Sequence, residues 1–135
     1  MTNPDGIWFR VEGTPIGKAR PRVTSRGAYM PTAYRAWLET VKREALAYWA
    51  EHSECADKDC AVRWYEPSHP AIVLVLVFYL PDRRRRDVDN LAGAVMDALN
   101  GVLWNDDSQI VRLVVEKHLA AKGEFVGVEV RAWTR

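Results

Sequence analysis

The sequence predicts a single α+β domain in which two main helices pack on one mixed β-sheet. Segments of strand composition and of helical periodicity follow one another in the order strand, helix, strand, helix, strand, strand. With 135 residues, 48% of them hydrophobic, the chain is long enough for one core and too short for two. No internal repeat is visible, so we expect residues 1–135 to form one domain.

The first half of the chain contains a strand, a basic arm and a helix. Residues 7–11 have strand composition, and the turn residues of 13–17 end that strand. Between Lys18 and Pro31 the residues Gly, Pro, Ser, Arg and Lys dominate, which predicts an ordered or partly ordered arm and no regular element. Thr32 is suited to cap a helix. Apolar residues recur every three to four positions on the core face of this helix, at Tyr34, Trp37 or Leu38, Val41, Ala45 and Tyr48 or Trp49.

The second half begins with a long connection at 52–70 and then a continuous apolar strand at 71–80. Val and Ile run through this strand without polar alternation, so we expect it to lie centrally in the sheet with both faces covered. Pro81 ends the strand. Two further strands are predicted at 110–118 and 126–133, and the last one alternates like a half-exposed strand.

A short helix is predicted at 90–100, between the apolar strand and the last two strands. Asp89 or Asn90 is expected to cap it, and Gly101 is suited to its C-terminal stop. One helical face carries the apolar residues Leu91, Val95, Ala98 or Leu99, and Val102.

Charge and targeting signals limit the classes of function. The net charge is only +1, from 19 basic and 18 acidic residues, so the chain does not coat nucleic acid by bulk electrostatics. Residues 1–35 are nevertheless strongly basic, so any grip on DNA is local. The opening residues lack the blocks of a secretory signal, and 71–80 is too short to cross a bilayer. We expect a cytoplasmic protein without membrane association.

Two cysteines, Cys55 and Cys60, lie in a charged stretch of the long connection. A disulfide is not implied in a reducing compartment. An inert loop is one interpretation, and a zinc site completed by His52 and His69 is a weaker one.

Four carboxylates bracket the short helix directly behind a run of four arginines. The carboxylates belong to Asp87, Asp89, Asp106 and Asp107. They repel one another unless a cation lies between them, and a set of oxygen ligands suits Mg²⁺ or Mn²⁺. The pair Asp87 and Asp89 and the pair Asp106 and Asp107 each also have an ordinary explanation, because Asp is common at helix caps and in turns.

The arginine run, Arg83 to Arg86, has planar guanidinium groups whose geometry matches phosphate. Together with the acidic residues it indicates a nuclease site, although a charged run is also typical of a solvated loop. The basic arm adds further candidates for the DNA backbone. The predicted DNA-binding residues are Lys18, Arg20, Arg22, Arg26, Arg83, Arg84, Arg85 and Arg86. Three aromatic residues, Tyr29, Trp64 and Trp104, are candidates for stacking on unpaired bases, but packing in the core or in an interface is the favoured role of Trp104.

Several motifs together resemble the RusA family of Holliday junction resolvases, often carried by phages and prophages. They are Asp-Arg-Arg-Arg-Arg-Asp-Val-Asp-Asn-Leu at 82–91, Met-Asp-Ala-Leu-Asn-Gly at 96–101, Trp-Asn-Asp-Asp-Ser-Gln-Ile at 104–110 and Glu-Lys at 116–117. The resemblance is close over 81–117. The segment Gly-Thr-Pro-Ile-Gly-Lys-Ala-Arg-Pro-Arg at 13–22 is similar to the amino-terminal segment of many members, and 50–70 matches nothing.

The resemblance implies a small α+β homodimer that binds four-way DNA junctions, as in DNA recombination and repair, and cuts two strands symmetrically with Mg²⁺ or Mn²⁺. By position, Asp87, Asp89 and Asp107 match the family's metal-binding catalytic carboxylates, and Asp106 has a weaker claim as a further metal ligand. Asn90 and Asp97 fall on other motif positions, where Asn90 caps the helix or steadies the site and Asp97 supports the ligands.

One position departs from the family pattern. The family has a lysine three residues after the motif Asn, and this chain has Gly93 there. Lys117 or Lys18 is a candidate substitute. Lys117 continues the apolar face of its strand, where a buried ammonium needs an anionic partner such as the carboxylate cluster; alternatively it is a surface lysine that reaches into solvent.

Two rival functions follow from the same residues. In the first, the loss of the motif lysine at Gly93 marks a protein that binds four-way or other branched DNA with weak or no cleavage. In the second, the charged runs are solvated faces of a small interaction protein. Metal-dependent nicking separates the first rival from a nuclease, and salt-sensitive junction binding eliminates the second.

Overall fold

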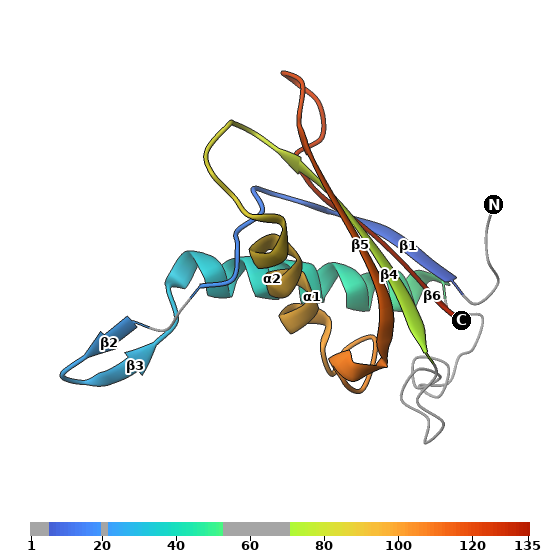
Figure 1. The fold of residues 1–135 in the computed structure, drawn as a ribbon, viewed down its shortest axis with the longest axis horizontal. Helices are drawn as coiled ribbons and strands as arrows, with labels where there is room; N and C mark the ends of the chain where they lie inside the picture. Colours follow the sequence, from blue (N-terminus) through green and yellow to red (C-terminus); the bar gives the residue numbers. More distant parts are fainter. Residues whose placement is uncertain (1–5, 20–21, 53–70) are drawn as a thin grey trace.

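The computed structural model describes residues 6–19, 22–52 and 71–135 and shows two helices packed on one side of a four-stranded mixed sheet (Figure 1). The strand order is β1-β6-β4-β5; β4 and β5 are parallel and the other neighbours antiparallel. This confirms the predicted α+β class. The elements are β1 Gly6–Glu12, β2 Arg22–Thr24, β3 Gly27–Tyr29, α1 Thr32–His52, β4 Ile72–Leu80, α2 Val88–Leu99, the 3-10 turn η2 Asp107–Gln109, β5 Ile110–Leu119 and β6 Gly127–Thr134.

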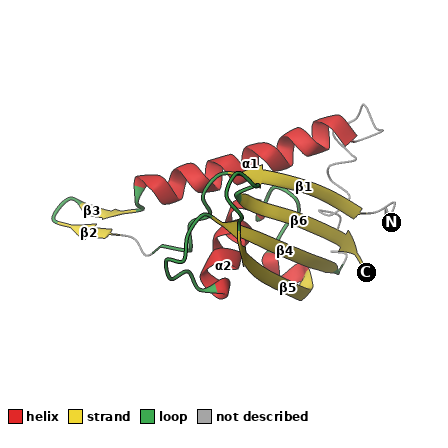
Figure 2. Cartoon of the chain, turned by 90° about the horizontal axis from the view of Figure 1, so that it is seen from above, coloured by secondary structure: helices red, strands yellow, loops and turns green. Residues whose placement is uncertain are grey.

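The core lies between the sheet and the helices. Alternate side chains of each inner strand point to this side, because successive residues of a strand face opposite surfaces. Leu76 on β4, for example, lies between Val130 on β6 and Val115 on β5. Helix α1 contributes the predicted stripe, with these residues buried: Tyr34, Trp37, Val41 and Ala45. Figure 2 shows α1 running along the sheet beside β1.

Strand β4 is central, as predicted, but the expectation that both of its faces are covered is wrong. Its burial alternates, and Val75, Val77 and Tyr79 are only half-buried on the face without helices. Apolar residues on both sides of a strand do not require a third layer, because large neighbours on the open face shield part of their surface.

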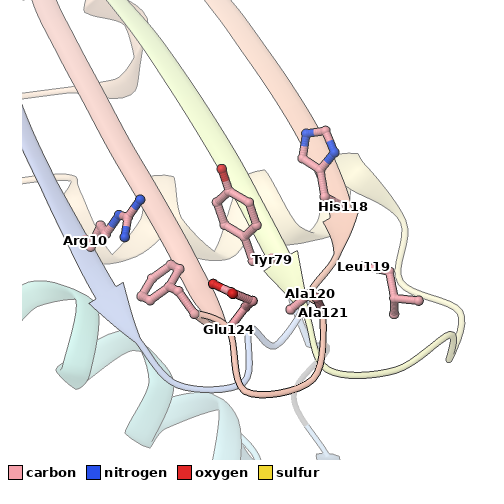
Figure 3. A pocket seen from close by; sticks show the side chains of 8 residues that line it. Arg10, Tyr79, His118, Leu119, Ala120, Ala121 and Glu124 are labelled. Atoms are coloured by element: carbon pink, nitrogen blue, oxygen red, sulfur yellow. The ribbon is translucent and has the colours of Figure 1, made fainter.

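The open face carries a buried acid and an aromatic cluster. Glu129 is only 4% exposed and pairs with Arg10 and Arg131. Burial opposes its ionisation, but hydrogen bonds from Trp8 and Arg131 and the nearby guanidinium charges outweigh burial and lower the pKa of Glu129. Tyr79 stacks on His118 with ring centroids 5.7 Å apart. These rings line a hollow of about 400 Å³, and none of the predicted site residues lines it. Figure 3 shows the side chains around this hollow.

Two local predictions need correction. The basic arm contains a small hairpin, in which β2 and β3 pair around Ser25 and Arg26 and extend away from the sheet (Figure 1). Helix α2 begins at Val88 with Asp87 as its N-cap, so Asp89 and Asn90 lie in its first turn. Its predicted apolar face and its stop before Gly101 are confirmed.

In the described ranges, no helix is long and apolar enough to pass through a bilayer.

Candidate active site

Three distant segments meet at the N-terminus of α2. The chain leaves β4 at Pro81 and reaches α2 through the arginine run. Lys117 on β5 donates from Nζ to the carbonyl oxygen of Arg86 at 2.7 Å. From the other side, the backbone N–H of Lys18 donates to the carbonyl of Asn90 at 2.8 Å. The loop before α2 is therefore held between an edge strand and the segment that precedes the hairpin.

The arginine run divides into one internal residue and an exposed group. The Arg86 side chain is only 15% exposed, and its Nη1 lies 2.7 Å from Asp82 Oδ1. This hydrogen bond is the main reason that the pKa of Asp82 lies below its ordinary value. Arg84 and Arg85 are 84% and 90% exposed. Arg86 therefore stabilises the loop, whereas its neighbours are free to meet a phosphate backbone; DNA contact by all four stays a prediction.

Asp87 and Asp89 lie at the start of α2, but not as an extended pair. Asp87 is the N-cap residue without a side-chain cap bond, and its Oδ1 lies 3.5 Å from Arg85 Nε. Asp89 is exposed in the first helical turn. Asp87 itself has an extended backbone and the helix begins at Val88, so the two residues do not lie along one extended segment. The helix dipole favours negative charge at this end.

The surroundings of Asp107 shift the pKa of its carboxyl group. The indole Nε1 of the fully buried Trp104 donates to Asp107 Oδ1 at 2.8 Å and orients the group. Burial raises the pKa of Asp107 above its ordinary value, and the charges of Asp97 and Asp106 act in the same direction. The hydrogen bond from Trp104 and the charge of Lys18 oppose this rise. The core position of Trp104 confirms the favoured interpretation of that residue.

Asp106 has a structural role. Its side chain accepts a hydrogen bond from the backbone of Ser108 at 3.1 Å and caps η2. The buried Gln109 completes a capping box by accepting from the backbone N–H groups of Asn105 and Asp106. This reciprocal bonding holds the turn that carries Asp107. The weaker metal claim of Asp106 stays a prediction.

Asp97 joins the helices at the same place. Its Oδ2 accepts a hydrogen bond from the hydroxyl of Tyr34 at 3.2 Å and lies 3.4 Å from Lys18 Nζ. Sequence reasoning placed Tyr34 only in the core stripe and missed this contact. The available signal was the residue type, because a buried tyrosine hydroxyl usually finds a polar partner.

The other predicted residues have varied outcomes. Lys117 is exposed and bonds a backbone carbonyl, so the interpretation as a surface lysine is confirmed and the alternative, burial against the carboxylates, is wrong. Arg26 and Tyr29 are exposed on the hairpin. The remaining predictions lie outside the described residues: Arg20, the side chain of Arg22, and the connection with Cys55, Cys60, Trp64 and His69.

The donor chemistry of the site fits a hard cation, since Asp87, Asp89 and Asp107 offer oxygen ligands. Within the described ranges, however, no three Asp, Glu, His or Cys side chains form a ready-made group for a metal ion. The carboxylates are therefore not preassembled, and metal binding stays a prediction. A hollow of about 250 Å³ reaches one of these carboxylates, Asp87, and is lined by Gly17, Lys18, Arg85, Arg86, Asp87 and Asn90.

Removal of the Tyr34 hydroxyl tests the link between α1 and α2. Tyr34→Phe is expected to lower the free energy of unfolding by about 1 kcal/mol, the typical value of one lost hydrogen bond. The pKa of Tyr34 is raised to about 12, first by burial and then by Asp97, so the hydroxyl is a protonated donor at neutral pH. Urea unfolding measures the change. Tyr29→Phe, at a half-exposed ring on the hairpin, is the matched control and should change nothing.

The chain is similar in sequence to several known proteins. A segment of 46 residues is 50% identical to the crossover junction endodeoxyribonucleases RusA of Escherichia coli strain K12 and of Enterobacteria phage 82. It covers 33% of this chain and 38% of each relative. The uncharacterized protein YqaN of Bacillus subtilis is 28% identical over 124 residues, which cover 84% of this chain and 87% of YqaN. The family model of the endodeoxyribonuclease RusA matches residues 12–131, so this chain belongs to the RusA endodeoxyribonuclease family.

Proposed function

We propose that this protein is a structure-specific DNA endonuclease that resolves four-way junctions by metal-dependent hydrolysis of paired phosphodiester bonds. The observation that carries the proposal is Asp107, a partly desolvated carboxylate that Trp104 orients beside Asp97 and Lys18, within a chain of the RusA family. A carboxylate with a pKa shifted by burial and by charged neighbours is typical of a functional site.

The residues take distinct roles in this proposal. Asp87, Asp89 and Asp107 would hold Mg²⁺ or Mn²⁺, with Asp106 as a weaker candidate, and the metal would supply Lewis-acid activation of the scissile phosphate. Arg84 and Arg85 would bind backbone phosphates at the mouth of the hollow, since their guanidinium groups are exposed and Arg85 lines it. Trp104 fixes the direction of the Asp107 carboxylate, and Lys117 holds the loop that carries Asp87. The buried core behind Trp104 excludes water from one side of that carboxylate.

A homodimer is part of the proposal. Two nicks at equivalent strands of a four-way junction require two active sites related by a two-fold axis. Strand β5 lies at an edge of the sheet and exposes large apolar side chains, which favours a protein partner there. These are Val111, Leu113 and Leu119, at 50%, 42% and 51% exposure. Sedimentation equilibrium of the whole chain, with and without junction DNA, measures the dimer.

The central test is cleavage of a labelled mobile four-way junction, compared with linear duplex of the same sequence, in Mg²⁺, Mn²⁺ or EDTA. Paired nicks on the junction, absent in EDTA and on the duplex, are the expected result. Binding of the junction without nicks in every metal contradicts the proposal. That outcome favours the second candidate, a junction-binding protein, which the absence of a lysine side chain at Gly93 on α2 supports.

The exposed arginines predict a salt effect on DNA binding. Arg84→Ala with Arg85→Ala is expected to reduce the slope of log affinity against log salt by about 2, since each phosphate contact contributes roughly 0.9. Fluorescence anisotropy with labelled junction over a range of KCl concentrations measures it. Arg43→Ala, which removes an exposed arginine from α1, is the matched control. An unchanged slope in the double variant contradicts phosphate contact by this pair.

A further inference from the structure

Lys18 lies along one face of α2. Its backbone N–H binds the carbonyl of Asn90, and its ammonium reaches Asp97 Oδ2 at 3.4 Å. Between these two points its side chain crosses Gly93, where an added Cβ would meet Lys18 Cδ at 3.3 Å and Cβ at 3.7 Å. Residues 90, 93 and 97 follow one another at helical spacings of three and four, so they share this face. The lysine side chain therefore covers the glycine.

The approach of Lys18 depends on small residues at two positions. A Cβ at Gly17 would meet Asn90 Cβ at 3.2 Å, so glycine also permits the neighbouring backbone to come close to α2. The ammonium then lies beside Asp97, which together with Asp106 acts on Asp107 by its negative charge. The positive charge of Lys18 acts on Asp107 in the opposite direction. Lys117 is held elsewhere by the carbonyl of Arg86.

We propose that Lys18 is the positioning lysine of this site, supplying across Gly93 the positive charge that α2 itself lacks. The inference rests on the proposed endonuclease function and adds the residue that sets the charge around Asp97 and Asp107. The ion pair is half-exposed, so its worth for stability is small. Its role is to hold the acidic side chains in a fixed arrangement when a phosphate backbone approaches. Glycine at position 93 leaves room for the lysine stem, because an added Cβ would lie only 3.3 Å from Lys18 Cδ and the stem would have to shift.

Moving the lysine from position 18 to position 93 tests where the ammonium must lie. Lys18→Ala is expected to lower turnover at saturating junction by about 10- to 100-fold, as for other residues that orient ligands, while junction affinity in EDTA changes by less than about threefold. The double variant Lys18→Ala with Gly93→Lys restores the charge from the helix itself and should regain most of the turnover. Lys42→Ala removes an exposed lysine from α1 and is the matched control.

The outcomes separate cleanly. Full turnover in Lys18→Ala overturns the proposal. Loss of turnover that the double variant does not regain also overturns it, because Lys18 then acts only by packing the segment against α2. Recovery in the double variant supports it, since a purely structural role of Lys18 would not be replaced by a lysine on another element.

A stability measurement tests the same contact without any cleavage assay. Alanine is a better helix former than glycine, so Gly93→Ala should raise the melting temperature when Lys18 has been changed to Ala. With Lys18 present the gain should be smaller, because the new methyl group meets the lysine stem. Equal gains in both backgrounds overturn the packing of Lys18 on Gly93. If the wild-type protein cuts no junction in any metal, the endonuclease proposal fails. The difference between the two gains in melting temperature still tests whether Lys18 packs on Gly93.

Discussion

Asp107→Asn is expected to reduce junction cleavage by about 100-fold or more and to leave junction binding intact or tighter. The carboxylate is the one that Trp104 orients at 2.8 Å, and an amide oxygen can still accept that hydrogen bond. The substitution therefore removes one negative charge with little change of shape. Because the phosphate backbone is also negative, binding does not suffer from this loss. Single-turnover cleavage in Mg²⁺ and anisotropy in EDTA measure the two effects.

The same substitution should stabilise the protein in EDTA at neutral pH. The pKa of Asp107 is raised by burial and by its acidic neighbours, so the folded state resists the charged form. Stability from such a group is present below the ordinary pKa, about 4, and is lost as pH rises through the raised value. Asparagine suffers no such loss. The melting temperature of Asp107→Asn should therefore exceed that of wild type at pH 7, and the difference should vanish in acid.

Asp106→Asn is the comparison that makes these results specific. It removes a neighbouring charge, but its amide oxygen can still cap the turn at Ser108. We expect a smaller loss of cleavage than at Asp107. Equal losses at both positions contradict the special role of Asp107. Loss of junction binding together with cleavage in Asp107→Asn contradicts its assignment to the chemical step.

The order of the main elements could be predicted because long apolar stripes and runs are visible in the sequence. The stripe of α1 and the apolar run of β4 are such patterns, and both lie where expected. The hairpin could not be found in this way, since β2 and β3 have three residues each and β3 is exposed throughout. The start of α2 was misplaced because Asp87, Asp89 and Asn90 are all good cap residues, and sequence does not rank them.

The site could be predicted only as a set of residue types. Asp87, Asp89, Asp106 and Asp107 were found because like charges gathered around one short helix. The contacts that organise them join distant positions: Tyr34 and Asp97 are 63 residues apart, and Lys18 reaches α2 across the fold. No local pattern reports such pairs. For Lys117 the local pattern was misleading. Its place in the strand suggested a carboxylate partner, but it donates to a backbone carbonyl.

Gly127→Ala is expected to lower the free energy of unfolding by about 3–5 kcal/mol and the melting temperature by on the order of 10 °C. Gly127 begins β6, where it pairs with Glu12 of β1 and Tyr79 of β4. Its φ of 155° is a conformation that side chains rarely adopt. An added Cβ would collide with the carbonyl oxygen of Val11 and lie 2.7 Å from Phe125 Cζ. The backbone of β1 cannot move away without loss of its ladder with β6.

Gly123→Ala separates the cost of the backbone angle from the cost of the collision. Gly123 also has a positive φ, 83°, but no atom of the described residues lies within 4 Å of an added Cβ. The angle alone costs about 1–2 kcal/mol, so Gly123→Ala should fall in that range by urea unfolding. The additional loss of unfolding free energy in Gly127→Ala then measures the cost of the collision between the new side chain and β1. Equal losses of unfolding free energy in the two variants would show that β1 relaxes away from β6. This edge of the sheet would then accommodate a side chain at position 127.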